Sequence, residues 1–155
     1  FAIPSNIGLS NDRGAYRAPF EQSLDISVLK LPGYDPEREN PLQFLEQAKE
    51  IDQNNIRLLD LSVSGCGFLV RRTIFDYNVD IHCLVFKGSL EINGEVIPWV
   101  AIPKYEVPFT QNKIEYQRVG VQFFGMNNLD RSIINRAVLK IEREQLRKEM
   151  DRKED

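Results

Sequence analysis

The sequence predicts a mainly β fold: a closed or nearly closed antiparallel sheet with a long C-terminal α-helix packed against it. From residue 23 to residue 124, short runs rich in β-branched and aromatic residues alternate with turn residues, which is typical of paired strands. From about Leu129 the spacing of apolar residues becomes helical. No apolar run approaches the roughly 18 residues of a membrane span, so no membrane insertion is expected.

The expected strands are separated by recognisable turn and break signals. Asn93-Gly94 predicts a tight hairpin turn. Pro98, Pro103 and Pro108 predict edges, bends or bulges, because proline cannot donate to a sheet ladder, and Trp99 is expected in the core. The strands are predicted at residues 23–31, 56–62, 67–72, 80–86, 88–92, 96–102, 106–110 and 113–124.

Two helices are expected. Asn40 and Pro41 predict an N-cap and first helical position of a short inserted helix within residues 32–55, ended by 52–55. The C-terminal helix is predicted at about 129–152, capped by Asn128 or Asp130. Its charged end is expected in water, with a helical oligomer contact as the alternative. Its apolar stripe consists of Ile133, Ile134, Ala137, Val138 and Ile141.

Composition indicates one globular domain of ordinary character. The chain has 155 residues, 42% hydrophobic and 28% charged, and a net charge of −3, which disfavours binding to a nucleic acid polymer. Residues 1–20 are expected to be a linker and residues 21–155 the domain. Because the chain starts at Phe1, we expect it to be part of a longer protein. Cys66 and Cys83 favour reduced thiols in a cytoplasmic protein, with a disulfide as the alternative.

Two short motifs carry the chemistry of a candidate binding site. Arg13-Gly-Ala-Tyr-Arg17 places two guanidinium groups in the expected linker, where they can grip phosphate oxygens or stack on a base. Asp60-Leu-Ser62-Val-Ser-Gly65 places a carboxylate and a hydroxyl on one face of a strand end. Together these groups suit an anionic ligand that carries a guanine.

Each of these residues also has a structural interpretation. Asp60 can accept hydrogen bonds from guanine N1–H and N2–H₂, or it can cap a turn. Ser62 can donate to a phosphate or make a local turn bond, and Gly65 is expected to serve backbone geometry first and ligand clearance second. Gly14 is expected to act in the same way within the linker, and the two arginines could simply be solvated.

Catalytic and metal chemistry find little support. His82 is the only histidine and lies in an apolar run, so we expect a core histidine. A metal cluster or a catalytic triad cannot be assembled around it, and no enzyme, cofactor or metal is expected.

With both motifs in this order, the sequence resembles the PilZ domain family. The resemblance covers roughly residues 12–148 and adds Gly120-Val-Gln-Phe123 and the helix after Leu129 to the two motifs. It implies a six-stranded antiparallel β-barrel that binds cyclic di-GMP, a bacterial second messenger. The ligand-binding residues it implies are Asp12, Arg13, Gly14, Arg17, Asp60, Ser62 and Gly65.

The chain departs from the family pattern at two places. The segment between Arg17 and Asp60 is longer than expected, which surface connections tolerate. Asp12 precedes the first arginine, at a position that in relatives helps decide between one bound ligand and an intercalated pair. Because an aspartate repels a second phosphate, we expect one ligand.

The resemblance leads to a functional hypothesis. The linker, mobile when empty, is expected to fold over cyclic di-GMP and to pass the signal to an attached upstream domain or a protein partner. Motility, biofilm formation through exopolysaccharide, pili and virulence are the candidate processes. A PilZ-like protein-interaction module that does not depend on nucleotide, and an enzyme acting on a nucleotide, are the alternatives.

Overall fold

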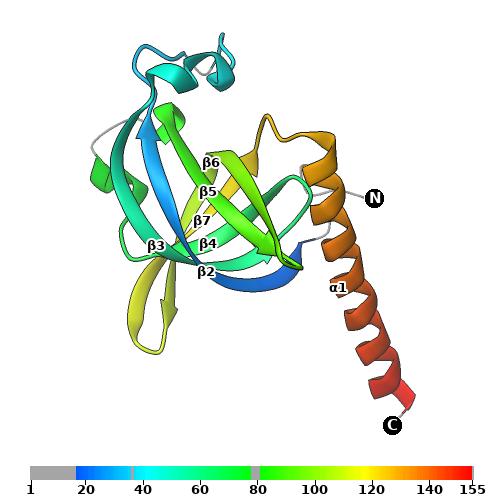
Figure 1. Cartoon of the computed structure of the whole chain (residues 1–155). Helices are drawn as coiled ribbons and strands as arrows, with labels where there is room; N and C mark the ends of the chain where they lie inside the picture. Colours follow the sequence, from blue (N-terminus) through cyan, green and yellow to red (C-terminus); the bar gives the residue numbers. More distant parts are fainter. Residues whose placement is uncertain (1–16, 36, 78–80, 155) are drawn as a thin grey trace, which may run out of the picture.

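Six antiparallel strands close into a barrel, and one long helix lies beside it (Figure 1). The computed structural model describes residues 17–35, 37–77 and 81–154. Around the barrel the strands follow the order β2, β3, β4, β7, β6, β5, and β5 pairs again with β2. The strands are β2 (Ala18–Lys30), β3 (Lys49–Leu61), β4 (Gly65–Val70), β5 (Leu84–Ile92), β6 (Glu95–Gln111) and β7 (Ile114–Phe123).

Several strands are longer than the sequence predicts. β2 begins at Ala18, inside the segment expected to be a linker, and β3 begins at Lys49, where the end of a helix was expected. Residues 49–55 are mostly polar, but the paired β2 supplies their ladder partners. The runs predicted at 96–102 and 106–110 form the single strand β6, which has a bulge between Pro103 and Tyr105.

Tight turns join the hairpins. Asn93 (φ 52°) and Gly94 (φ 83°) connect β5 to β6, which confirms the predicted hairpin turn. Asn112 (φ 53°) and Lys113 (φ 66°) connect β6 to β7 in the same left-handed conformation. The end of this second hairpin extends beyond the barrel (Figure 1).

The barrel interior is filled by apolar side chains that alternate with outward residues along each strand. Trp99 is 2% exposed, as predicted for a core residue, and Phe68 packs edge-on against Phe86 with ring centroids 5.7 Å apart. Neither Cys66 nor Cys83 is in a disulfide bond, and Cys66 is fully buried. The interior therefore leaves ligand chemistry to the outer face of the barrel.

The inserted segment forms a 3₁₀-helix, η2 (Pro41–Gln47), instead of a longer helix. Asn40 caps it by accepting a hydrogen bond from the backbone N–H of Leu42, so the predicted start is confirmed. The segment covers a second apolar cluster on the outside of the barrel, centred on Leu31, Tyr34 and Val85.

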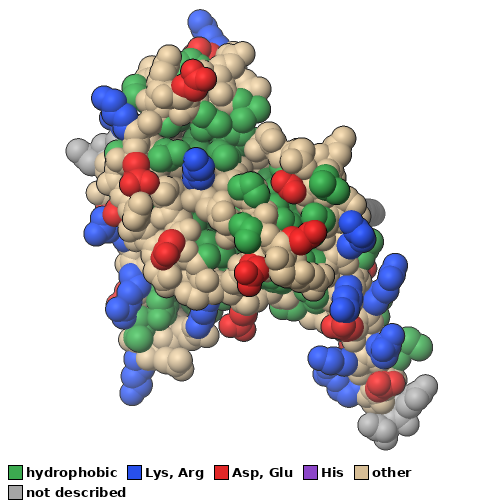
Figure 2. All heavy atoms as spheres, in the orientation of Figure 1, with side chains coloured by type: hydrophobic (Ala, Val, Ile, Leu, Met, Phe, Trp, Pro, Cys, Tyr) green, Lys and Arg blue, Asp and Glu red, His purple; other side chains and the backbone are tan. Residues whose placement is uncertain are grey.

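The C-terminal helix α1 (Asn128–Glu154) packs its first half on the barrel. Ile134 and Val138 are buried, as the predicted stripe requires. The cap differs from expectation: the side chain of Asn127 accepts from the N–H of Asp130. The second half extends away from the barrel (Figure 1), and Figure 2 shows Lys and Arg mixed with Asp and Glu along it. None of the described helices is both long and apolar enough to cross a membrane.

His82 does not lie in the core, so that prediction was wrong. It is exposed, in the short 3₁₀-helix η4 (Ile81–Cys83) that leads into β5, and a further 3₁₀-helix, η3 (Ile74–Tyr77), precedes it. The apolar run that suggested a core position belongs to β5, which begins at Leu84, so His82 precedes the strand.

Candidate functional site

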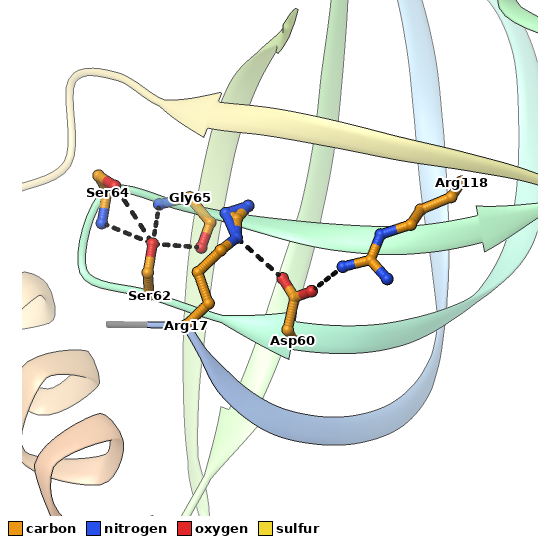
Figure 3. A network of polar contacts seen from close by, with 6 residues as sticks. All are labelled: Arg17, Asp60, Ser62, Ser64, Gly65 and Arg118. Carbon is orange, nitrogen blue, oxygen red and sulfur yellow. Dashed lines mark hydrogen bonds and ion pairs between the residues drawn. The ribbon is translucent and has the colours of Figure 1, made fainter. Parts of the chain in front are cut away.

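The candidate site is centred on Asp60, near the end of β3 on the outer face of the barrel. Its carboxylate lies between two guanidinium groups, that of Arg17 just before β2 and that of Arg118 on β7 (Figure 3). The Nε of Arg17 lies 3.5 Å from Oδ1 of Asp60, and Nη2 of Arg118 donates to Oδ2. The fold thus brings together residues that are 43 and 58 positions apart.

Asp60 is nearly buried but only partly satisfied. The residue is 8% exposed, and Oδ1 accepts no hydrogen bond from the described residues, although the charge of Arg17 is close. A buried acceptor without a donor is unfavourable, by about 1–3 kcal/mol. Oδ1 therefore lacks a hydrogen-bond donor among the described residues, while Arg118 holds the other oxygen in place.

Gly67 leaves the space that the Asp60 carboxylate occupies. It faces Asp60 across the β3–β4 ladder, and a Cβ at this position would lie 2.9 Å from Oδ1 of Asp60. Any larger residue would push the carboxylate aside. Sequence reasoning did not single out Gly67, because its role depends on which residue of β3 lies opposite.

Part of the Asp60-x-Ser62-x-x-Gly65 motif stabilises the turn between β3 and β4. Ser62 is 1% exposed, and its Oγ accepts hydrogen bonds from the N–H groups of Ser64 (3.3 Å) and Gly65 (3.1 Å) (Figure 3). The N–H of Ser62 in turn donates to the carbonyl of Gly65 at 2.8 Å. Ser62 therefore forms the local turn bond that was the alternative to ligand contact, and it fixes the β3–β4 turn beside Asp60.

Gly65 is required by the neighbouring strand. A Cβ at residue 65 would lie 2.0 Å from the carbonyl oxygen of Val121 on β7. The close approach is thus between two backbones, which agrees with the expectation that Gly65 serves backbone geometry first.

Of the other predicted site residues, Asp12, Arg13 and Gly14 lie outside the described residues. The structure brings Arg17 and Asp60 together in an ion pair. Arg118 was missed, although a charged residue beside the apolar run Val119–Gly120–Val121 is a signal that it has a partner. That partner could not be identified from the sequence, because β4 lies between the two strands in the barrel.

The charged groups of the site affect the pKa of the Cys66 thiol in the barrel interior. Burial is the main cause that raises the pKa of the Cys66 thiol, and the negative charge of Asp60 raises it further, whereas Arg17 lowers it. The thiol therefore stays protonated and unreactive at neutral pH. Among the described residues, no three His, Cys, Asp or Glu side chains lie close enough to hold a metal ion.

Solved PilZ domains share this fold. No protein-family model and no curated protein matches the sequence. The PilZ domain of YcgR from Escherichia coli with c-di-GMP matches with a TM-score of 0.55 and 17% identity, over 91% of this chain and 98% of that one. A longer YcgR structure in complex with c-di-GMP, also from Escherichia coli, matches with a TM-score of 0.54 and 16% identity, over 90% of this chain and 50% of that one.

The inhibitor of motility MotI/DgrA from Bacillus subtilis is also similar, with a TM-score of 0.49, 14% identity, and coverage of 90% of this chain and 54% of that one. The two YcgR structures confirm the predicted PilZ-like fold, a mainly β barrel with a C-terminal helix.

Proposed function

We propose that this chain, which has the fold of a PilZ domain, is a receptor that binds cyclic di-GMP at Asp60 and Arg17. The observation that carries the proposal is the Asp60 carboxylate, nearly buried beside an arginine and with one oxygen that accepts no hydrogen bond from the described residues. The fold adds support, because a PilZ domain of the same architecture has been solved with c-di-GMP.

The proposed recognition of the base follows from the donor and acceptor pattern of guanine. Its N1–H and N2–H₂ groups are adjacent donors, which match a carboxylate. Adenine presents an acceptor at N1, so it would place a lone pair against Asp60. Arg118 holds the second carboxylate oxygen and keeps Asp60 oriented.

The proposed recognition of phosphate uses the arginines of the first motif. Arg17 is paired with Asp60 at 3.5 Å through Nε, and its side chain remains 35% exposed. A ligand phosphate can draw this guanidinium away, since a bidentate arginine–phosphate pair is stronger than a single long contact. Arg13, four residues earlier in the sequence, would bind a phosphate of the same ligand.

The proposed output is a change in the position of the N-terminal segment. Binding of the ligand by Arg13 and Arg17 would fix this segment against the barrel, because both arginines precede β2. A domain attached upstream, or a protein partner, would read that change. The proposed activity is binding without chemical turnover.

Calorimetric titration with cyclic di-GMP tests the proposal. We expect saturable binding by the parent chain and much weaker binding by Arg13→Ala, Arg17→Ala and Asp60→Ala. Arg38→Ala is the matched control, because Arg38 is a highly exposed arginine that pairs only loosely with Asp35 at 3.8 Å. Absence of binding by the parent, or equal binding by the parent and all three site variants, would falsify the proposal. Cyclic di-AMP should bind far more weakly, and unchanged cyclic di-GMP should be recovered after incubation.

A further inference from the structure

A row of four residues crosses the outer face of the barrel beside the candidate site. Asp60 on β3 is paired with Gly67 on β4, Gly67 with Gly120 on β7, and Gly120 with Tyr105 on β6. The two central residues have no side chain, so the side chains at the two ends of the row can lie over them. We call Gly67 and Gly120 the glycine floor.

The side chains at the two ends of the row, Asp60 and Tyr105, lie over the glycine floor. A Cβ on Gly67 would lie 2.9 Å from the Asp60 carboxylate, and a Cβ on Gly120 would lie 2.1 Å from the ring of Tyr105. The carboxylate and the ring therefore lie above residues that are direct neighbours in an antiparallel ladder, whose Cα atoms are roughly 5 Å apart. That separation is within the width of one purine.

The two end groups differ in how a ligand would reach them. Tyr105 packs on Gly120 and is still 39% exposed, so a ligand can contact its ring. Asp60 contributes an independent observation, because its buried Oδ1 accepts no hydrogen bond from the described residues and lies over the floor, where a base would reach it once Arg17 moves away. One group can read the edge of a base, and the other can contact its face.

The geometry points to Tyr105 as a second base-recognition residue, which stacks on the guanine that Asp60 reads by its edge. This inference rests on the proposed function and adds to it a residue outside both sequence motifs. The glycine floor lets the Tyr105 ring and the Asp60 carboxylate lie close to the backbone, as only glycine permits, so that a planar base can stack on the exposed side of the ring. Stacking on an aromatic ring adds affinity for any base, whereas Asp60 selects guanine.

Titration of single variants with cyclic di-GMP tests the inference. Tyr105→Ala should bind roughly 5- to 150-fold more weakly, the loss expected for one base–aromatic stack. Tyr105→Phe keeps the ring and should bind like the parent. Val107→Ala is the matched control, since Val107 is 43% exposed two residues further along β6, and it should also bind like the parent. Melting curves should be nearly equal for all these surface variants.

The outcomes separate this inference from the proposed function. Loss of affinity in Tyr105→Ala with retention in Tyr105→Phe supports stacking. If the parent binds, Asp60→Ala loses binding and Tyr105→Ala is unaffected, the inference is wrong and the proposed function stands. Equal losses in Tyr105→Ala and Tyr105→Phe would overturn stacking in favour of a hydroxyl contact. If the parent chain does not bind at all, both the proposed function and this inference fail.

Discussion

Replacement of Asp60 by alanine separates ligand recognition from fold stability. The substitution removes the one carboxylate that lies between Arg17 and Arg118, and it leaves the β3–β4 turn intact because Ser62 and Gly65 make their own bonds. A guanine edge would then meet a methyl group where it needs two acceptors. A good bidentate pair contributes about 1–3 kcal/mol of base discrimination, so we expect roughly 5- to 150-fold weaker binding of cyclic di-GMP.

The stability of the variant should change little. The arginine side chains that lose their partner are 35% and 31% exposed, so water can solvate both. Partly exposed ion pairs contribute about 0–1 kcal/mol each, so the loss of the two pairs corresponds to a melting shift of at most about 4–8 °C for a domain of this size. The removed buried acceptor also offsets part of that loss.

Calorimetry with cyclic di-GMP and cyclic di-AMP, together with thermal melting, measures both effects. We expect the guanine preference to disappear while the melting temperature stays close to that of the parent. If Asp60→Ala keeps the affinity and the guanine preference of the parent, our account of base recognition is refuted. A melting temperature lower by more than about 10 °C would show instead that Asp60 holds the barrel together.

Three further predictions concern the neighbours of the site and the core. Arg118→Met removes the group that orients the Asp60 side chain. Calorimetry should show roughly 2- to 12-fold weaker binding of cyclic di-GMP, because the ligand must then immobilise that side chain. Arg72→Met is the control, and equal affinity of the two variants would contradict the role of Arg118. Phe68→Ala should lower the free energy of unfolding by about 3–5 kcal/mol in urea titrations, because Phe68 is fully buried, and a loss below about 1 kcal/mol would contradict this. Cys66 has a raised pKa when folded, so an unfolded thiol ionises first, near its usual value of 9.0. The free energy of unfolding of the parent should therefore fall by about 1.4 kcal/mol more than that of Cys66→Ala between pH 7 and pH 10, and parallel pH profiles would contradict the assignment.

Local signals in the sequence predicted the elements that depend on neighbouring residues. Asn93-Gly94 adopts the left-handed conformations that a two-residue hairpin requires, and Asn40 caps the inserted helix. The apolar stripe on α1 is likewise a local pattern, and its residues Ile134 and Val138 are buried on the barrel.

Features that depend on distant residues were not predictable in this way. The first half of β3 is polar and is a strand because β2 pairs with it, so its own pattern does not reveal it. The same limit applies to the site, where Asp60 and Arg17 were identified from motifs. Arg118 and Gly67 matter because β7 and β4 place them close to Asp60. The register between paired strands decides which side chains come into contact, and local sequence patterns do not predict that register.

The most direct test of the central claim is a titration of the ¹⁵N-labelled chain with cyclic di-GMP, followed by amide NMR spectra. The account predicts saturable shifts at Arg17, Asp60, Gly67 and Gly120, which lie around the carboxylate and its floor. Shifts that are absent, or that are confined to η2 and the second apolar cluster around Leu31, would contradict it.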